Sequence, residues 1–456
     1  MVSSRASTVK PGQLPWPTTA YAWAVVAILC FANVVSFIDR SVITLMVGPI
    51  KADLGLTDTH MGLLMGFAFA LFYALMAVPI GVAADRWKRT RIISIGVIFW
   101  TIATACCGLA KNFGQLFLAR MSVGIGEATL SPSTMSLIGD YFPRDRMAKP
   151  IGAFAAAGYA GFGIAILIGG YVVQAVQQSG PINVPVFGLL QPWQFAFVCV
   201  AVPGVLVWAL MFLVREPARR GLTTGVEASA QEGLRGLFTP DRGRAYLAIL
   251  IGFPVLAVLG YGTASWVPEF FRRIHGWQPA DIALGYGLVF LICGTAGPFA
   301  GGWFTDWLAQ RGYRDANLRA AIMAVLALVP FQLAFPLVDN AGLALALLVP
   351  TTFLGAVPFG VSTSALITIT PNRRRALVAA IYLFIGNLVG LGLGPLSVAL
   401  ITDHVFADEM AIHYSLVVTA TVVIPIGLVA LLLGLRPFKR AMEEEVRLEQ
   451  QAEALT

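Results

Sequence analysis

The stretch Gly81-Val-Ala-Ala-Asp85-Arg86-Trp-Lys88-Arg89-Thr-Arg91 joins two long apolar segments. Its first part, a glycine and three residues before an aspartate, recurs as Gly302-Trp-Phe-Thr-Asp306 at the end of a later apolar segment. A second pair follows in the same order, because Tyr141-Phe-Pro143-Arg144 and Thr370-Pro371-Asn-Arg373 each end an apolar segment with a proline and an arginine. Two spaced matches in one order indicate that the chain consists of two repeated halves.

The composition places both halves in a membrane. Hydrophobic residues make up 57% of the 456 residues and charged residues only 12%, against about 25% charged residues in a soluble domain. A bilayer core needs roughly 20 apolar residues per helix, and the chain has twelve such segments. They lie near residues 21–48, 59–83, 92–110, 113–139, 150–174, 193–213, 245–270, 282–304, 318–338, 342–369, 376–402 and 413–435.

One long polar connection, residues 214–244, divides the twelve segments six and six. We therefore predict an all-α polytopic membrane protein with two pseudo-symmetric six-helix bundles. The predicted parts are a cytoplasmic N-terminal tail (1–20), an N-terminal bundle (21–213), a cytoplasmic linker (214–244), a C-terminal bundle (245–435) and a cytoplasmic C-terminal tail (436–456).

The distribution of positive charge predicts the orientation. Cytoplasmic loops are enriched in lysine and arginine, and with both termini inside, 25 of the 31 lysines and arginines fall in cytoplasmic segments. The net charge of +7 is thus explained by topology and does not indicate a nucleic-acid partner. We predict that both termini are cytoplasmic.

The Gly81–Arg91 stretch resembles the signature loop of the major facilitator superfamily, although Lys88 stands where many members carry a glycine. Within that superfamily, Phe37-Ile-Asp39-Arg40 and Ala119-Arg120-x4-Ile125-Gly126-Glu127-Ala128 look like the spinster family of lysolipid and sphingosine-phosphate transporters. Organic-anion and cation symporters carry similar elements. The resemblance implies a twelve-helix transporter that works by alternating access in a bacterial inner membrane.

Four ionisable residues at membrane depth, Asp39, Arg40, Arg120 and Glu127, mark the predicted working site. Arg120 and Glu127 are seven residues apart, so they share one helix face about 10 Å apart. Asp39 lies at a similar depth on the first helix, where a pair with Arg120 is geometrically plausible. We predict that Glu127 and Asp39 carry a proton, and that Arg120 pairs with them or receives an anionic substrate group. The alternative is a static ion network that holds helices together.

Other polar residues are candidate substrate ligands. Arg40 either faces the cavity or extends to the outer interface, because neighbouring helix residues point about 100° apart. Asn33 is either a ligand or an interhelical hydrogen bond. The second half has no charged residue away from its helix ends, and Tyr261 and Asn387 are its candidate ligands. One cavity wall would thus be charged and the other largely apolar, which suits an amphipathic substrate.

A conformational latch is predicted at the cytoplasmic side. Asp85 can stabilise the positive N-terminus of the eleventh helix, and Arg86, Arg89 and the repeated Asp306 would belong to the same latch. As the resemblance implies, it would hold the outward-open state. A simple positive loop explains the arginines but not the repeated aspartate. Glycine-rich stretches in the fifth and eleventh segments favour close helix approach at the interface between the halves.

These features predict a proton-coupled secondary transporter of an amphipathic anion, such as a lysophospholipid or a sphingosine-phosphate-like lipid. The alternative is a proton-coupled symporter of small organic anions such as sugar acids. The chain shows no phosphate-binding loop, nucleophile elbow or metal-ligand spacing, so we expect no enzyme activity, cofactor or metal. A channel is disfavoured by the repeat and by the lack of a filter element. We expect a monomer in contact with membrane lipids.

Overall fold

The computed structural model describes residues 16–143, 146–185, 188–219, 240–371 and 374–453. Within them, eleven helices are long and apolar enough to cross a membrane. The fourth predicted segment is divided into α6 (Phe113–Glu127) and α7 (Leu130–Tyr141). Pro132 accounts for the break, because a proline ring clashes with the carbonyl four residues earlier, here that of Ala128. With α6 and α7 taken as one span, the described chain has the twelve predicted spans.

The first half contains six spans and a short hairpin. Its elements are α1 (Thr19–Ser41), η1 (Val42–Leu45), α2 (Val47–Leu54), α3 (Asp58–Gly62), η2 (Leu63–Phe67), α4 (Ala68–Arg86), α5 (Arg89–Cys107), α6, α7, α8 (Ala148–Ser179), β1 (Ile182–Val184), β2 (Gly188–Leu190) and α9 (Pro192–Met211).

The second half also contains six spans. Its elements are α11 (Pro240–His275), α12 (Pro279–Ile282), η4 (Ala283–Gly287), η5 (Phe290–Gly294), α13 (Thr295–Gln310), α14 (Ala316–Ala334), η6 (Phe335–Leu337), α15 (Ala341–Thr368), α16 (Arg375–Gly386), η8 (Asn387–Leu391), α17 (Gly392–Leu400), η9 (Ile401–Phe406), η10 (Glu409–Ala411) and α18 (Ile412–Glu453).

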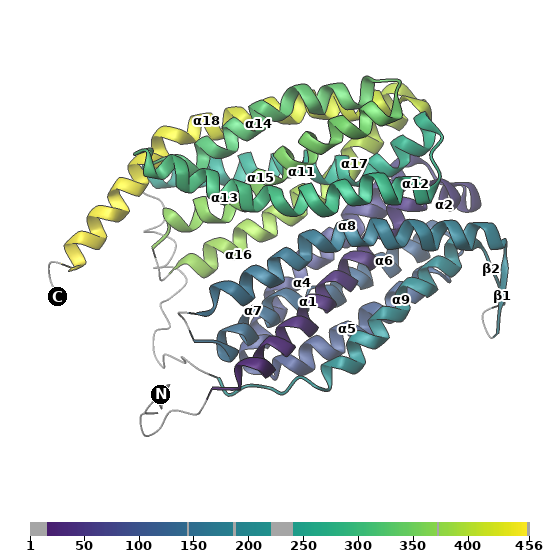
Figure 1. Ribbon diagram of the computed structural model, residues 1–456, viewed down its shortest axis with the longest axis horizontal. Coiled ribbons are helices and arrows are strands. Elements are labelled where there is room, and N and C mark those ends of the chain that lie inside the picture. The colour runs from purple at the N-terminus through teal and green to yellow at the C-terminus, as the bar shows by residue number, and fades with distance from the viewer. Residues whose placement is uncertain (1–15, 144–145, 186–187, 220–239, 372–373, 454–456) are drawn as a thin grey trace, which may run out of the picture.

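Helix packing repeats between the halves, as the sequence repeat predicts. In the first half α1 packs on α8 and α9, and α5 packs on α6 and α9. In the second half α11 packs on α17 and α18, and α14 packs on α15 and α18. Figure 1 shows the two groups of helices lying side by side with their long axes nearly parallel. Helices are the expected spanning element, because the bilayer core leaves no other partner for the backbone groups.

Two pairs of spans make the most extensive contacts between the halves. The fifth span, α8, packs on α12, η4 and η5 of the eighth span, and α17 of the eleventh span packs on α3 and η2 of the second. Short π-helical turns interrupt three of these four spans, at η2, at η4 and η5, and at η8 and η9. Such turns are frequent at functional sites.

Glycines permit these close approaches. A Cβ at Gly66 in η2 would lie 2.7 Å from the carbonyl oxygens of Leu391 and Gly392 in the other half. In α8, Gly163 faces Leu291 across the interface, as predicted for the fifth segment. Gly390 and Gly394 of the eleventh segment differ from the expectation, because they pack against α11 in their own half.

The two ends of the molecule carry different elements. α1 begins and α18 ends at the same end, on the left in Figure 1, which we call the proximal end. The opposite, distal end carries α2, α12 and the β1–β2 hairpin. Residues 1–15, 220–239 and 454–456, which include much of the predicted tails and linker, lie outside the described residues. The C-terminal tail predicted from 436 continues α18 without a break to Glu453.

Candidate functional site

A cavity of about 430 Å³ lies between the two halves. Five of the predicted site residues line it, namely Asn33, Arg40, Glu127, Tyr261 and Asn387. The only charged side chains in this described lining are Arg40 and Glu127, and both belong to the first half. The wall contributed by the second half consists of apolar and uncharged polar residues, as its sequence predicts.

Arg40 and Glu127 form an ion pair at the cavity wall. The distance from Arg40 Nη2 to Glu127 Oε2 is 2.7 Å, and Ser36 Oγ donates a hydrogen bond of 2.6 Å to the same oxygen. The side chain of Glu127 is fully buried and that of Arg40 is 14% exposed. Arg40 therefore takes the cavity-facing orientation of the two that the sequence left open.

Aromatic rings surround the guanidinium group of Arg40. Its central carbon lies 4.8 Å from the ring centre of Phe37, 4.3 Å from that of Phe69 and 5.4 Å from that of Tyr73. The negative faces of aromatic rings attract a cation, more strongly where water is excluded. The rings and Glu127 together hold the guanidinium group of Arg40 in place, although little water surrounds it.

In this structure Arg120 contacts backbone carbonyl groups and not the predicted carboxylates. Its guanidinium group donates to three carbonyl oxygens, those of Leu64 at 3.3 Å, Asp39 at 3.1 Å and Arg40 at 3.2 Å, and it makes no ion pair with either predicted carboxylate. Arg120 is fully buried and is not among the residues that line the cavity. The carbonyls in the last turn of a helix lack intrahelical partners, and a cation there is favourable. Arg120 therefore stabilises the end of α1.

Asp39 is buried inside the first half, away from the cavity lining. Neither of its carboxyl oxygens has a hydrogen-bond partner among the described residues. The indole N–H of Trp100 and the hydroxyl of Thr104, both on α5, lie beside it but outside hydrogen-bonding geometry. A buried charge without a partner is costly. The free energy of this conformation therefore depends on the protonation state of Asp39.

The remaining predicted ligands also make local contacts. Asn33 donates a hydrogen bond of 3.0 Å to the carbonyl of Phe154, so α1 is bonded to α8 at the cavity wall. Asn387 donates to Leu383 within its own helix at 2.8 Å. Tyr261 packs edge-on against Phe359. Asn33 thus makes the interhelical bond and also lines the cavity, and its role as a substrate ligand stays a prediction.

Among the cavity residues that the sequence prediction did not include, two contact the Arg40–Glu127 pair. Ser36 bonds Glu127, and Tyr73 covers Arg40. Ser36 lies four residues before Arg40, so both share one helix face, and this spacing could have identified it. Tyr73 gave no comparable signal, because it lies in an apolar helix whose rotation depends on its neighbours.

The residues of the predicted cytoplasmic latch lie near the proximal end and are not brought together. Asp85, Arg86 and Asp306 are exposed, and their side chains make no hydrogen bond or ion pair within the described chain. Arg89 is buried instead, and it pairs with Asp140 and, at 2.8 Å, with Glu216. Arg89 therefore bonds the start of the linker rather than the eleventh span.

Glu216 caps the start of α5. One of its carboxylate oxygens accepts hydrogen bonds of 3.0 Å from both the backbone N–H and the hydroxyl of Thr90. Burial raises the pKa of Glu216, but the bonds from Thr90 and Arg89 outweigh it and hold the pKa below its ordinary value. The first described residues of the linker are thus tied to the first half.

Comparison with known proteins identifies the family and several relatives of this chain. Residues 29–395 match the sequence model of the Major Facilitator Superfamily. The chain is 25% identical over 428 residues to an MFS-type efflux pump of Mycolicibacterium smegmatis, covering 93% of this chain and 95% of that protein. It is 27% identical over 306 residues to a probable L-galactonate transporter of Escherichia coli, covering 64% of this chain and 63% of that protein.

Spinster proteins are also among the relatives. The sphingosine-1-phosphate transporter SPNS2 of Xenopus tropicalis is 24% identical over 409 residues, which cover 85% of this chain and 76% of that protein. Among solved structures, a bacterial homolog of the human lysosomal transporter spinster, in an inward-facing and occupied conformation, is similar with a TM-score of 0.73. It is 27% identical, and the match covers 94% of this chain and 98% of that chain.

Proposed function

The chain is a transporter of the major facilitator superfamily, related to spinster proteins, and we propose that it couples the movement of an amphipathic anion to protons. The observation that carries this proposal is the cavity between the halves, with the Arg40–Glu127 pair on one wall and uncharged residues on the other. Alternating access would expose this cavity first to one end and then to the other.

The ion pair suggests how proton and substrate are coupled. Arg40 is the one cation in the described cavity lining, and the carboxylate of Glu127 already neutralises it. An anionic head would therefore compete with Glu127 for the same guanidinium group. A proton on Glu127 removes that competition and leaves Arg40 free for the anion. Proton and anion would then bind together and travel in the same direction.

Asp39 is proposed as the second proton site. Its carboxyl group is buried without a hydrogen-bond partner among the described residues. Arg120 lies nearby but binds only the backbone carbonyl of Asp39, and a buried charge with incomplete compensation is costly. A proton would remove that cost in this conformation. Arg120 binds the backbone carbonyls of both Asp39 and Arg40 at the end of α1. A movement of one of these two residues would therefore also move the other.

The uncharged wall suggests an apolar substrate tail. Leu256, Leu259, Phe290, Leu328 and Phe359 face the cavity from the second half. A lysophospholipid or a sphingosine-phosphate-like lipid has the matching chemistry, an anionic head and an apolar chain. The alternative substrate is a small organic anion such as a sugar acid, and the similarity to a probable L-galactonate transporter is the observation that favours it.

The orientation and location follow from the charge distribution. We propose that the proximal end faces the cytoplasm of a bacterial cell, since the cationic loops gather there, and that the protein acts as a monomer in the inner membrane. In the present structure, bonds such as that of Arg273 to Asp58 join the two halves at the distal end. Access to the cavity would then be from the proximal side.

Uptake into proteoliposomes under an imposed pH gradient tests the proposal. Labelled lysophospholipid, sphingosine phosphate and a hexonate are compared for the wild type, Glu127→Gln and Asp39→Asn, with Glu444→Gln near the proximal end as the matched control. We expect the gradient to drive accumulation of a lipid in the wild type and control only, while Glu127→Gln still exchanges substrate at equilibrium. Gradient-driven accumulation by Glu127→Gln would refute the proposal. Accumulation of the hexonate alone would replace the lipid with a sugar acid.

A further inference from the structure

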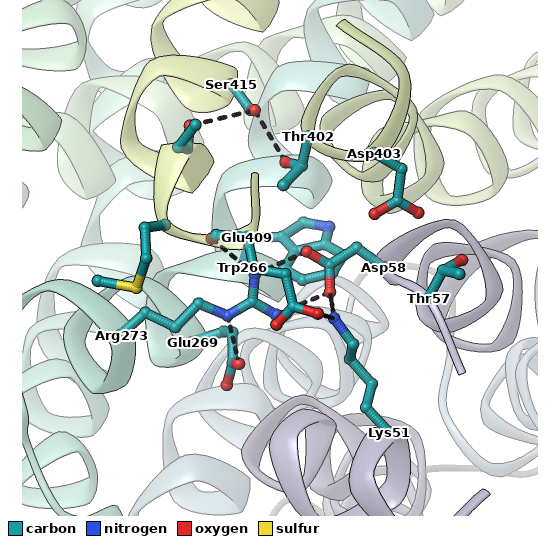
Figure 2. A network of polar contacts seen from close by, with 12 residues as sticks. Lys51, Thr57, Asp58, Trp266, Glu269, Arg273, Thr402, Asp403, Glu409 and Ser415 are labelled. Atoms are coloured by element: carbon teal, nitrogen blue, oxygen red, sulfur yellow. Dashed lines mark hydrogen bonds and ion pairs between the residues drawn. The ribbon is translucent and has the colours of Figure 1, made fainter. Parts of the chain in front are cut away.

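A cluster of charged residues joins the two halves at the distal end. We call Lys51, Asp58, Glu269, Arg273 and Glu409 the distal ion cluster. Lys51 and Asp58 belong to α2 and α3 of the first half, and the other three belong to α11 and η10 of the second. Figure 2 shows Arg273 between Glu269 and Asp58, with Lys51 reaching Asp58 and Glu409 from the other side.

Three close contacts of this cluster cross between the halves. Arg273 binds Asp58 with both terminal nitrogens, at 2.6 and 2.7 Å. Lys51 lies 2.7 Å from Glu409. Nearby, the backbone N–H of Thr59 donates a hydrogen bond of 2.6 Å to Asp403 of the second half. These bonds hold the distal end closed in this structure.

Each cation of the cluster also has a carboxylate in its own half. Lys51 lies 2.5 Å from Asp58, and Arg273 lies 2.6 Å from Glu269. Asp58 is fully buried and the side chain of Arg273 is 3% exposed, whereas that of Glu409 is 61% exposed. Breaking a buried ion pair is costly when it leaves one charge uncompensated.

We propose that the distal ion cluster is a latch in which each cation releases its carboxylate in the other half and keeps the carboxylate in its own half. When the halves separate, Lys51 keeps Asp58 and Arg273 keeps Glu269, so neither buried cation is left without a carboxylate. Glu409 loses Lys51 but is already largely in water. The latch thus holds the distal end closed at a low cost of reopening, as repeated transport cycles require. It rests on the proposed alternating access but on neither the substrate nor the proton sites.

This arrangement predicts opposite effects for two carboxylates of one cluster. Asp58→Asn alone would also remove the carboxylate that Lys51 keeps on opening, so this substitution is made in the Lys51→Gln background. There it removes the acceptor that Arg273 binds across the interface, while Arg273 keeps Glu269, so the open state gains. Glu269→Gln removes the partner that Arg273 would keep on opening, so Arg273 depends on Asp58 and the closed state gains. A merely structural cluster would lose thermal stability in both variants without this opposition.

Distances between spin labels at the distal end test the proposal. The labels are placed at Lys111 in the first half and Asp339 in the second, both close to the distal ends of their helices, in a variant that lacks the five native cysteines and still transports. Asp281→Asn is the matched control, because Asp281 bonds only the backbone of Gln278 in its own half. Measurement without substrate or pH gradient keeps this test separate from that of the proposed function.

In the Lys51→Gln background, we expect Asp58→Asn to raise the ratio of the long-distance to the short-distance population by about tenfold or more, since truncating a buried charge pair shifts an equilibrium by at least this factor. Glu269→Gln should lower that ratio, and Asp281→Asn should leave it unchanged. Glu269→Gln is also measured in the Glu409→Gln background. Because the latch is weaker there, the starting ratio is higher and a decrease can be measured. Equal populations in all variants would overturn the proposal. So would a shift in the same direction for Glu269→Gln and for Asp58→Asn in the Lys51→Gln background.

Discussion

The neighbours Asp39 and Arg40 show what sequence can and cannot determine about a single residue. Helix geometry predicts that they point about 100° apart and cannot both face one cavity. The structure agrees, but Arg40 lines the cavity and Asp39 points into the first half beside Trp100. The rotation of α1 about its axis depends on packing against the neighbouring helices. No spacing within α1 contains that information.

At Arg40 we predict that the shape of the cation matters as well as its charge. Arg40→Lys keeps the charge but loses the planar group that lies among Phe37, Phe69 and Tyr73. We expect KM for the transported anion to rise about tenfold, with a smaller effect on kcat, in proteoliposome uptake. Arg314→Lys, at an exposed site, is the control. An unchanged KM would show that the aromatic surroundings contribute nothing to binding.

At Arg120 we predict a loss of stability. Arg120→Gln removes donors from the carbonyls of Leu64, Asp39 and Arg40. Each buried acceptor left without a donor costs about 1–3 kcal/mol, so the free energy of unfolding should fall by several kcal/mol. Thermal unfolding in detergent measures this. A variant with wild-type stability that no longer binds substrate would instead support the anion-binding role predicted from the sequence.

Among the elements, the spans were well predicted because an apolar run of sufficient length has few alternatives in a bilayer. The division of the fourth span into α6 and α7 was not. Glu127 is the last residue of α6, directly before the break at Ala128 and Thr129. Pro132 was visible in the sequence, but a proline near membrane depth can either kink a helix or end it, and the neighbouring helices decide between the two.

The start of α5 gives a prediction of pH dependence. Glu216, held there by Thr90 and Arg89, has a pKa below its ordinary value of 4.5. A carboxyl group with a lowered pKa in the folded state stabilises the protein above its unfolded pKa, and this contribution is lost as the pH falls through the folded value. Because Glu216 is partly exposed, its contribution should be about 1 kcal/mol.

We therefore expect Glu216→Gln to lower the thermal unfolding temperature at pH 7. The difference from the wild type should shrink as the pH falls below 4.5, where the wild-type carboxylate becomes protonated. Scanning calorimetry at several pH values measures it, with Glu443→Gln at a half-exposed site as the control. A difference that stays constant down to low pH would contradict the assignment.

On the scale of the whole molecule, the repeat predicted more than the number of helices. The contact of α8 with the eighth span and that of α17 with the second are equivalent under the exchange of halves. What the repeat could not predict is which end is closed. That depends on cross-half bonds such as Arg273 to Asp58, between residues 215 positions apart, and no local pattern connects them.

The close contact at Gly66 gives a prediction for the transport cycle. A Cβ at this position would lie 2.7 Å from two carbonyl oxygens of the other half, so Gly66→Ala should disfavour the distally closed state without disturbing the first half itself. We expect kcat for transport to fall about tenfold with little change in unfolding temperature. Gly302→Ala is the control, because a Cβ there meets no atom within 4 Å. Unchanged transport by Gly66→Ala would show that the interface can move apart at this point to accommodate the methyl group.

The neutral Arg40–Glu127 pair also bears on the driving force. If a monoanion replaces the carboxylate as Glu127 takes up a proton, and the charge of Asp39 is the same in both, the loaded and empty carriers differ by no net charge. The membrane voltage then neither helps nor opposes the step. A phosphate monoester with two negative charges would leave one uncompensated, worth about 2.3 kcal/mol per 100 mV. An inside-negative potential would then favour export of such a lipid. The ionisation of the headgroup would thus decide whether transport is electrically silent.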